Sequence, residues 1–260
     1  MAFERTFSRR RILHLLAGSV ALTAAGPARA REARIARLIA QAQTLPEISQ
    51  RIDFISRALI GTRYRRYTLI GGPHRPEQFV VRDDYFDCVT FCETVLAAAL
   101  VREPSAFAAA LRQIRYRGGE IGWRERNHYF SEWGANNTAA GICAPVICPG
   151  SETVAKTLTE MRALGPRRTS FEAIPRESLV ANRKLLATCD IIAFLSRRSD
   201  LDVFHTGFVV VDGDGDLWLR HAARSRGRVA DSSLALFLKQ NHVRAVTLLR
   251  PRDPEYDVNV

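Results

Sequence analysis

The dipeptide Asp87-Cys88 combines a nucleophilic side chain with the expected start of a helix. Residues 82–85 before it are polar, and residues 89–100 after it are apolar at helical spacing, without Gly or Pro. A thiol in the first helical turn lies at the positive end of the helix dipole, which favours the nucleophilic thiolate. Asp87 itself could be the N-cap of this helix or could bind a cationic group of a substrate. Cys88 is therefore the candidate nucleophile of an acyl-transfer enzyme.

Two histidines are expected to share one face of a β-hairpin. Residues 203–211 and 217–222 are rich in β-branched and aromatic residues, and the Asp- and Gly-rich residues 212–216 between them predict a five-residue turn. With this turn, His205 and His221 are diagonal neighbours whose Cα atoms lie about 7–8 Å apart. Their side chains then point to the same face, whereas a register slip of one residue would separate them.

A cysteine nucleophile requires a base, and the base requires a group that orients it. We predict that His205 pairs with Cys88 and later protonates the leaving amine, while His221 orients His205. The backbone N–H of Cys88 is the expected donor to the oxyanion, and water would hydrolyse the resulting thioester.

A second motif, residues 126–133, supplies groups suited to a saccharide or a peptide. An arginine there could pair with a substrate carboxylate, and its aromatic residues could line a groove. The alternative is a loop whose aromatic residues pack on the core. The candidate substrate-binding residues of the whole chain are Tyr64, Tyr85, Asp87, Arg126, His128, Tyr129 and Trp133.

These motifs resemble the NlpC-type papain-like cysteine peptidases, which cleave amide bonds in bacterial cell-wall peptides. The order in that superfamily is Cys, then His on a strand, then a polar residue on the next strand. Cys88, His205 and His221 stand at the matching positions. Residues 85–93 and 126–133 more narrowly resemble the N-acetylmuramoyl-L-alanine amidase-like branch of the superfamily.

The resemblance covers most of the chain from about residue 45 onward. It implies hydrolysis of the bond between N-acetylmuramic acid and L-Ala in muropeptides. Cys189 departs from the pattern, because a small residue, commonly Gly, is usual at that position. The alternatives are a cell-wall peptide endopeptidase of the same superfamily, another acyl-transfer reaction, or a non-catalytic envelope-binding module.

The periodicity of the chain independently predicts an α+β fold, with helices first and strands afterwards. Together with the resemblance, it implies a papain-like fold whose nucleophile helix packs on a C-terminal antiparallel sheet. The helices are expected at residues 31–43, 45–59, 88–103, 107–114 and 178–186. The strands are expected at residues 189–195, 203–211, 217–222 and 243–249. Residues 118–141, rich in aromatic, Asn and Gly residues, predict a long functional loop or lid.

The first thirty residues contain the three parts of an export signal. A paired arginine precedes an apolar run, and Ala28-Arg29-Ala30 fits a small-x-small cleavage site. We expect a twin-arginine-type signal peptide at residues 1–30, one amidase domain at residues 31–260, and a periplasmic or exported protein. The alternative is an uncleaved helix or anchor, although the apolar run is too short for a membrane span.

The charge of the chain favours an anionic partner outside the cytoplasm. Residues 1–30 carry five arginines and one glutamate, so the net charge of +11 falls to about +7 without them. Such a surface suits an anionic envelope polymer, and no interleaved aromatic and basic motif indicates nucleic acid. We expect muropeptides as partners of a monomeric protein.

Neither a metal nor a cofactor is expected. No His-Glu-x-x-His motif or paired Cys and His spacing occurs, and residues 212–216 fit a turn better than a calcium loop. Cys92 is expected in the core. Cys143 and Cys148 could close a small disulfide in an oxidising compartment.

Overall fold

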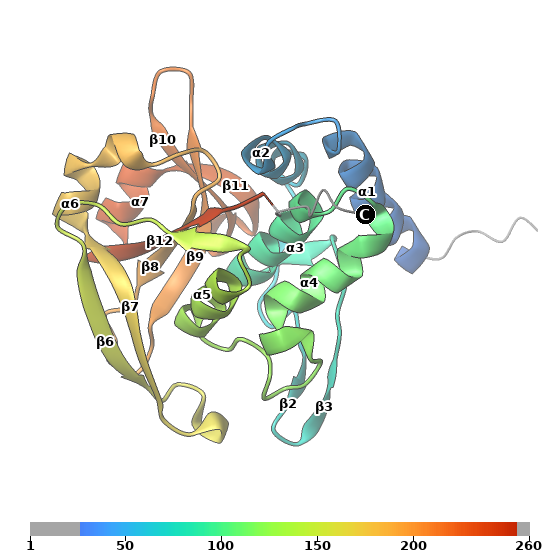
Figure 1. Ribbon diagram of the computed structural model, residues 1–260, viewed down its shortest axis with the longest axis horizontal. Coiled ribbons are helices and arrows are strands. Elements are labelled where there is room, and N and C mark those ends of the chain that lie inside the picture. Colours follow the sequence, from blue (N-terminus) through green and yellow to red (C-terminus); the bar gives the residue numbers. More distant parts are fainter. Residues whose placement is uncertain (1–26, 254–260) are drawn as a thin grey trace, which may run out of the picture.

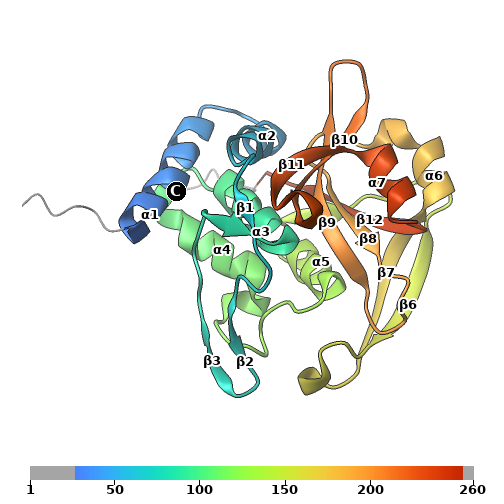
Figure 2. The ribbon, with the colours of Figure 1, turned by 180° about the vertical axis from the view of Figure 1, so that it is seen from behind.

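A computed structural model of the protein describes residues 27–253. Most of the expected export signal, residues 1–26, lies outside this range. A ten-stranded sheet runs through the described part, and helices cover both of its faces (Figure 1). Seen from behind, β1 (Arg63–Tyr64) and β11 (Arg228–Ser233), which lie near one edge of the sheet, are beside helix α3 (Cys88–Leu100) (Figure 2).

The helices and strands of residues 27–253 have the following bounds. The α-helices are α1 (Pro27–Ala42), α2 (Ile48–Ala58), α3 (Cys88–Leu100), α4 (Phe107–Arg115), α5 (Phe130–Ala139), α6 (Arg176–Ala181) and α7 (Leu234–Gln240). The strands are β1 (Arg63–Tyr64), β2 (Ile70–Gly72), β3 (Arg75–Gln78), β4 (Tyr85–Phe86), β5 (Cys143–Pro145), β6 (Glu152–Leu158), β7 (Arg167–Pro175), β8 (Ile191–Leu195), β9 (Val203–Val211), β10 (Leu217–Ala223), β11 (Arg228–Ser233) and β12 (Ala245–Pro251).

The expected nucleophile helix forms at α3, which begins at Cys88. Asp87 is its N-cap, and the Asp87 carboxylate accepts a hydrogen bond from the backbone N–H of Thr90. Most of the helix is buried, including Cys92 at 1% exposure, which confirms the expected core position of that thiol. The apolar character of α3 therefore reflects a helix enclosed by neighbours rather than an amphipathic surface helix.

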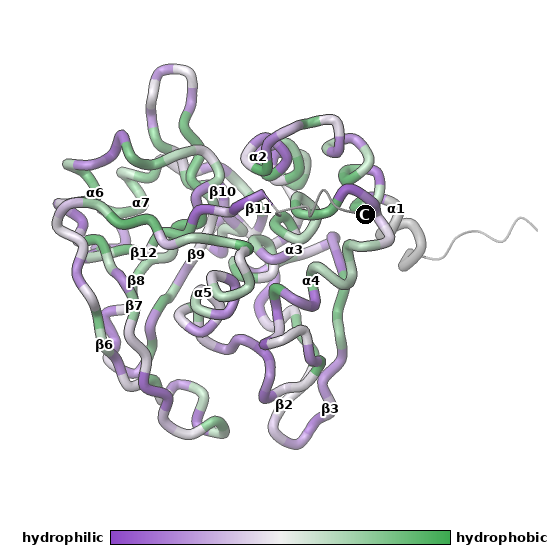
Figure 3. Tube along the Cα trace, in the orientation of Figure 1, coloured by the Kyte–Doolittle hydropathy of each residue, from purple (hydrophilic) through white to green (hydrophobic). Residues whose placement is uncertain are grey.

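The β9–β10 hairpin has the expected register. Val211 pairs with Leu217 and Phe208 pairs with Arg220, as a five-residue turn requires. The carboxylate of Asp212 accepts hydrogen bonds from backbone N–H groups within the turn. The tip of this hairpin projects from the rest of the molecule and is hydrophilic, whereas more hydrophobic residues lie along the strands of the sheet (Figure 3). Residues 212–216 therefore form a turn, as predicted.

Side chains of the central strands alternate between two hydrophobic clusters. Ile191 and Ala193 of β8 face the cluster that includes α3, whereas Ile192 and Phe194 face the cluster with α6 and α7. Apolar side chains therefore cover both faces of the sheet. Successive residues of a strand point to opposite faces, so they contact different helices.

The sheet differs from the expected C-terminal antiparallel sheet. Its order is β4-β1-β11-β10-β9-β8-β12-β7-β6, with β5 paired to β12, so segments from the first half of the chain take part. β1 and β4 pair in parallel. The elements β1, β4, β7, β11 and α7 were not expected from the sequence. β1 and β4 are too short to show a period, α7 has only seven residues, and β7 and β11 mix polar with apolar residues.

Part of the expected lid, residues 118–141, is instead buried helix α5. Its residue Trp133 is 1% exposed and stacks on Phe130. A Cβ at Gly134 would lie 3.2 Å from Leu249, so glycine permits close packing on β12. The Asn137 side chain donates to backbone carbonyls, including that of Trp133 at 2.8 Å. Glycine and asparagine thus have packing roles here, although they resembled loop residues in the sequence.

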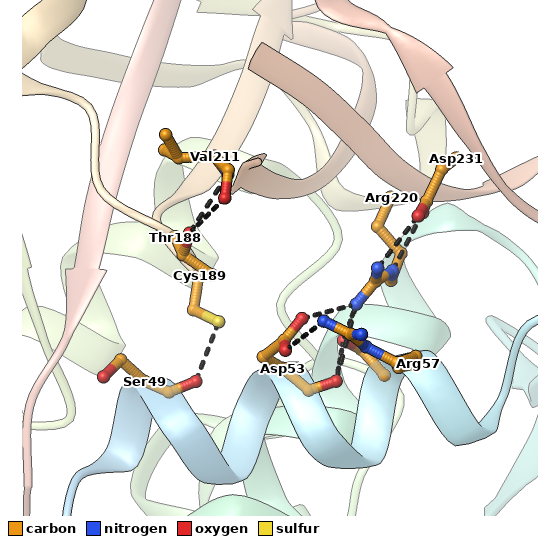
Figure 4. Close-up of polar contacts among 9 residues, drawn as sticks. Ser49, Asp53, Arg57, Thr188, Cys189, Val211, Arg220 and Asp231 are labelled. Atoms are coloured by element: carbon orange, nitrogen blue, oxygen red, sulfur yellow. Dashed lines mark hydrogen bonds and ion pairs between the residues drawn. The ribbon is translucent and has the colours of Figure 1, made fainter. Parts of the chain in front are cut away.

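The buried side chain of Arg220 connects α2 to the sheet. The Arg220 guanidinium donates to both carboxylate oxygens of Asp231 on β11 at 2.8 Å and to Asp53 of α2 at 2.8 Å (Figure 4). The exposed side chain of Arg57 also forms an ion pair with Asp53. Beside this network, the thiol of Cys189 donates to the carbonyl of Ser49 at 3.0 Å. β10, which carries His221, is therefore tied to α2 by polar contacts.

Within residues 27–253, no helix has the length and apolar character needed to cross a membrane. The described side chains also contain no group of three or more His, Cys, Asp or Glu residues arranged to hold a metal ion. All five cysteines of the chain fall in this range and are free thiols, so Cys143 and Cys148 do not form a disulfide.

Candidate active site

Cys88 occupies the first position of α3, and its neighbours hold this helix start rigidly. The Asp87 carboxylate accepts hydrogen bonds from the Thr90 backbone and from the hydroxyls of Thr68 and Thr90, all at 2.8 or 2.9 Å. Both carboxylate oxygens are therefore used within the protein. Of the two roles considered for Asp87, the structure shows the N-cap.

The partly exposed Cys88 lies on the wall of a groove of about 520 Å³. The other walls come from the segment after β1, the strand β2 and the residues that precede α5. The lining residues are Tyr64, Arg66, Tyr67, Thr68, Leu69, Gly71, Asp87, Cys88, Val89, Thr90, Glu93, Arg126, Asn127 and His128. The groove is large enough to accept part of a peptide or a sugar ring beside the thiol.

The hairpin brings His205 and His221 into direct contact, as the sequence predicted. Nε2 of His205 lies 2.6 Å from Nδ1 of His221, and Nε2 of His221 lies 3.1 Å from the Ser232 hydroxyl. The His205 ring also stacks on Phe194 and on Phe237 of α7. Among the described residues, Nδ1 of His205 makes no hydrogen bond, so it is the ring nitrogen left for a reacting group.

Gly207 makes this close approach possible. A Cβ at Gly207 would lie 2.7 Å from the carbonyl oxygen of Arg220 and 2.9 Å from the Cβ of His221. Only glycine allows the two strands to come this close without displacement. The contact between the histidines thus depends on a residue without a side chain, two positions after His205.

Cys88 meets the sheet at Thr206, the residue after His205. The Thr206 backbone acts to lower the pKa of the Cys88 thiol and the Thr206 hydroxyl acts to lower that of the Cys92 thiol, so both thiols lie close to Thr206. Strand alternation directs the His205 ring to the opposite side of β9. In residues 34–253, no hydrogen bond joins Cys88 to His205, and neither His205 nor His221 lines the groove. In the structure, therefore, the two histidines contact each other. The Cys88 thiol lies beside Thr206, which follows His205 directly on β9.

The regular pairing of β9 with β10 stops next to these residues. The β9–β10 ladder ends at the pair Phe208–Arg220, before it reaches His205. Thr206 pairs with Ala193 of β8, whereas the ladder with β10 stops two residues short of it, so the β10 side of its backbone can face the Cys88 thiol.

The electrostatics of the site differ from the expected thiolate–imidazolium pair. Burial, followed by the negative charge of Asp87, raises the pKa of Cys88 to about 12. Burial and then the neighbouring His221 lower the pKa of His205 to about 3. Burial and then Arg226 lower the pKa of His221 to about 4, against an opposing effect of Asp231. These shifts favour a neutral thiol and neutral imidazoles at neutral pH, because burial outweighs the backbone hydrogen bonds that lower the pKa of Cys88.

Of the aromatic substrate-binding candidates, Tyr64 and His128 line the groove, whereas the others have structural contacts. Tyr129 is 1% exposed and its hydroxyl accepts from the backbone N–H of Met161, and Trp133 is part of the core. Tyr85 lies outside the lining and stacks under Arg82 and Arg65. The alternative of aromatic residues packed on the core thus holds for Tyr129 and Trp133, since α5 buries them.

Two of the groove candidates, Arg126 and His128, already have partners inside the protein. Nη1 of Arg126 lies 3.3 Å from Glu77, a carboxylate that also accepts from the Tyr116 hydroxyl. Nε2 of His128 lies 2.6 Å from the carbonyl oxygen of Trp123, and burial lowers the pKa of His128 to about 4. A substrate carboxylate at Arg126 would therefore compete with Glu77.

Sequence reasoning missed several residues of the site. Thr68 and Thr90 hold the Asp87 carboxylate, Thr206 contacts the thiol, and Arg66 and Tyr67 line the groove. The pattern Asp87-x-x-Thr90 is a capping-box signal that could have revealed Thr90. The other residues carry no local signal, because their roles arise only from contacts between distant segments.

Comparison with known proteins supports the amidase-like resemblance. Residues 54–246 match the model of the AmiA-like family, which is described as N-acetylmuramoyl-L-alanine amidase-like. No curated protein was found to match the sequence.

Solved structures share the fold. A Legionella pneumophila protein is 22% identical over 86% of this chain and 95% of its own, with a TM-score of 0.75. An N-acetylmuramoyl-L-alanine amidase from Bacteroides uniformis is 25% identical over 76% of this chain and 97% of its own, with a TM-score of 0.64. A further structure of that name and organism is 24% identical, covers 85% and 100%, and has a TM-score of 0.66. Because the family model spans well over half of the chain, the protein belongs to the N-acetylmuramoyl-L-alanine amidase-like family.

Proposed function

We propose that this protein is an exported, cysteine-dependent peptidoglycan amidase that hydrolyses the bond between N-acetylmuramic acid and L-Ala in muropeptides. The observation that carries the proposal is the arrangement of Cys88 at the start of α3, open to a groove and next to the strand that bears the His205–His221 pair. Family membership and the Bacteroides uniformis amidase support the reaction class. The order of these residues supports an NlpC-type, papain-like assignment.

In the proposed reaction, the thiol of Cys88 loses its proton to Nδ1 of His205 as sulfur attacks the lactyl carbonyl carbon. Because both groups are neutral beforehand, the proton transfer accompanies the attack. Catalysis by this pair requires a rearrangement on substrate binding that brings Cys88 within hydrogen-bond reach of His205, because the two side chains do not contact each other in the structure. His221 holds Nε2 of His205 and thereby its orientation.

The backbone at the start of α3 has a defined role in the same step. The N–H of Cys88 is a first-turn donor without an intrahelical acceptor, and it would stabilise the oxyanion of the tetrahedral intermediate. The imidazolium of His205 then gives its proton to the amine of L-Ala, which leaves with the peptide. Water, deprotonated by His205, hydrolyses the muramoyl thioester and regenerates the thiol.

The test is product analysis by mass spectrometry with a defined muropeptide. The wild-type protein should release a peptide with a free L-Ala amine together with the saccharide. Cys88→Ala should lower the rate by at least about 10³-fold while the protein stays folded. The matched control is Cys148→Ala, which removes a partly exposed thiol outside the groove and should keep activity.

Two outcomes would contradict the proposal. Full activity of Cys88→Ala would exclude the cysteine mechanism. Cleavage within the peptide, with the saccharide still attached to L-Ala, would identify an endopeptidase instead.

A further inference from the structure

Six exposed arginines lie on adjoining segments next to the groove. β1 and β11 pair at Arg63 and Arg228, and the backbone N–H of Tyr64 donates to the carbonyl of Gly227 at 2.8 Å. The short 3-10 helix Arg224–Arg226 immediately precedes β11. Figure 2 shows β1 and β11 beside α3, the helix that begins at Cys88. The exposed arginines of these segments are Arg63, Arg65, Arg66, Arg224, Arg226 and Arg228, here called the arginine cluster.

No acidic side chain of the described residues forms an ion pair with any member of the arginine cluster. The nearby carboxylates already have partners. Asp84 pairs with Arg82, Asp231 pairs with the buried Arg220, and Asp87 caps α3. By contrast, Arg126 in the groove is paired with Glu77. The cluster is therefore a patch of positive charge that forms no ion pair within the described part of the chain.

The positive charge of the cluster reaches the site. Arg66 lines the groove together with Cys88. Arg66 and Arg224 both act to lower the pKa of Tyr64, whose phenol also senses Cys88. Arg226 acts to lower the pKa of His221. The same three arginines thus influence groups on both sides of the thiol, and an anion bound there would lie beside the reacting bond.

Tyr67 gives Arg66 a fixed neighbour at the groove. Tyr67 is 85% exposed and has a backbone φ of +55°, an uncommon conformation for a bulky residue. The Arg66 guanidinium lies 5.4 Å from the centre of the Tyr67 ring. An exposed aromatic ring paired with an unneutralised guanidinium is suited to a substrate group that is both planar and anionic, such as a carboxylate.

We propose that Arg66, Arg224 and Arg226 bind free carboxylates of the peptide part of the muropeptide, so that the enzyme selects acidic peptides over amidated ones. This inference rests on the proposed function. On the muramoyl side, the lactyl carboxyl group forms the scissile amide and is not free. The free carboxylates therefore belong to the leaving peptide. The arginine cluster would therefore hold the leaving side, and the saccharide would extend along the rest of the groove.

The experiment compares two muropeptides that differ only in whether the peptide carboxylates are free or amidated. The wild-type kcat/KM should be about tenfold higher for the acidic substrate at low salt, and the preference should shrink as salt increases. In the triple variant R66Q, R224Q and R226Q, the ratio between the substrates should fall to near one.

The control is the triple variant R112Q, R162Q and R197Q, which removes the same charge from exposed arginines outside the groove and should keep the wild-type ratio. Equal wild-type kcat/KM values for the two substrates would overturn the inference, as would an equal loss of the ratio in both triple variants. The absence of peptide release from either substrate by the wild type would instead overturn the proposed function. Selective binding of a polyanionic envelope polymer, with no substrate preference, would assign the arginine cluster to docking.

Discussion

Asp87 acts on Cys88 in two opposite directions. Its carboxylate holds the start of α3 through Thr68 and Thr90, and this places the thiol at the positive end of a helix. Its negative charge adds to burial in raising the pKa of the thiol to about 12. The Asp87 cap therefore fixes the position of the thiol but disfavours its thiolate form, so in the proposed reaction another group must take the thiol proton as sulfur attacks.

The pH dependence of catalysis follows from these residues. We expect kcat/KM to vary little between about pH 5 and pH 9, because His205 is protonated only toward pH 3 and Cys88 ionises only toward pH 12. The measurement is kcat/KM across this range with a substrate whose own groups do not titrate in it. A bell-shaped profile with limbs near neutrality would indicate a preformed thiolate–imidazolium pair and would contradict the neutral resting state.

At the scale of elements, the β9–β10 hairpin holds the histidines because the two strands approach at a glycine. Gly207→Ala should destabilise the fold by at least about 2 kcal/mol and lower activity more than tenfold, because the new Cβ meets the Arg220 carbonyl oxygen at 2.7 Å. Urea unfolding and the amidase assay measure the two effects. Gly213→Ala, in the same hairpin with open space around it, should change stability by less than about 0.5 kcal/mol. Equal effects of the two variants would refute the role of close approach.

The contact of α2 with the sheet depends on Arg220. Arg220→Met should cost about 2–4 kcal/mol, because the side chain is 3% exposed and its loss leaves Asp231 without its cation (Figure 4). Arg57→Met is the matched control: Arg57 contacts the same Asp53 but is 66% exposed, so its loss should cost less than about 0.5 kcal/mol. Chemical denaturation of both variants tests the difference. Similar losses would mean that burial does not decide the strength of these ion pairs.

Because both faces of the sheet are covered, several histidines of the molecule are largely buried, and burial lowers their pKa values. His128, His205 and His221 all have pKa values lowered mainly by burial, to about 4, 3 and 4. The unfolded chain binds protons at these imidazoles near their ordinary pKa of 6.5, whereas the folded protein does not. Folding stability should therefore fall as the pH decreases from about 6.5 to about 4.

Denaturant unfolding between pH 7 and pH 4 tests this linkage. The wild-type free energy of unfolding should decrease with falling pH, and His128→Gln should weaken the decrease by removing one of the three groups. A variant whose pH dependence is identical to that of the wild type would show that His128 takes up its proton equally in both states. Far-ultraviolet circular dichroism at pH 7 provides the check that the variant folds.

Features that depend on neighbouring residues could be predicted from the amino-acid sequence. The start of α3 follows from Asp87 and the apolar run after it, and the contact of His205 with His221 follows from the turn length and the alternation along strands. These predictions hold because capping and hairpin register are local geometry. The same local reasoning led to error at α5, where glycine and asparagine serve packing rather than a loop.

The surroundings of those local features depend on packing between distant segments of the chain. Burial raises the pKa of Cys88 and lowers that of His205, which reverses the charge state expected from the helix dipole. Arg126 is paired with Glu77 and Trp133 is buried, whereas Arg66, at the groove, forms no ion pair with the carboxylates that the structure describes. Desolvation and ion pairing depend on segments that are distant in the chain, so no window of the sequence contains them. The chain specifies its candidate nucleophile and histidines locally, and only the packed molecule fixes their protonation and the walls of the groove.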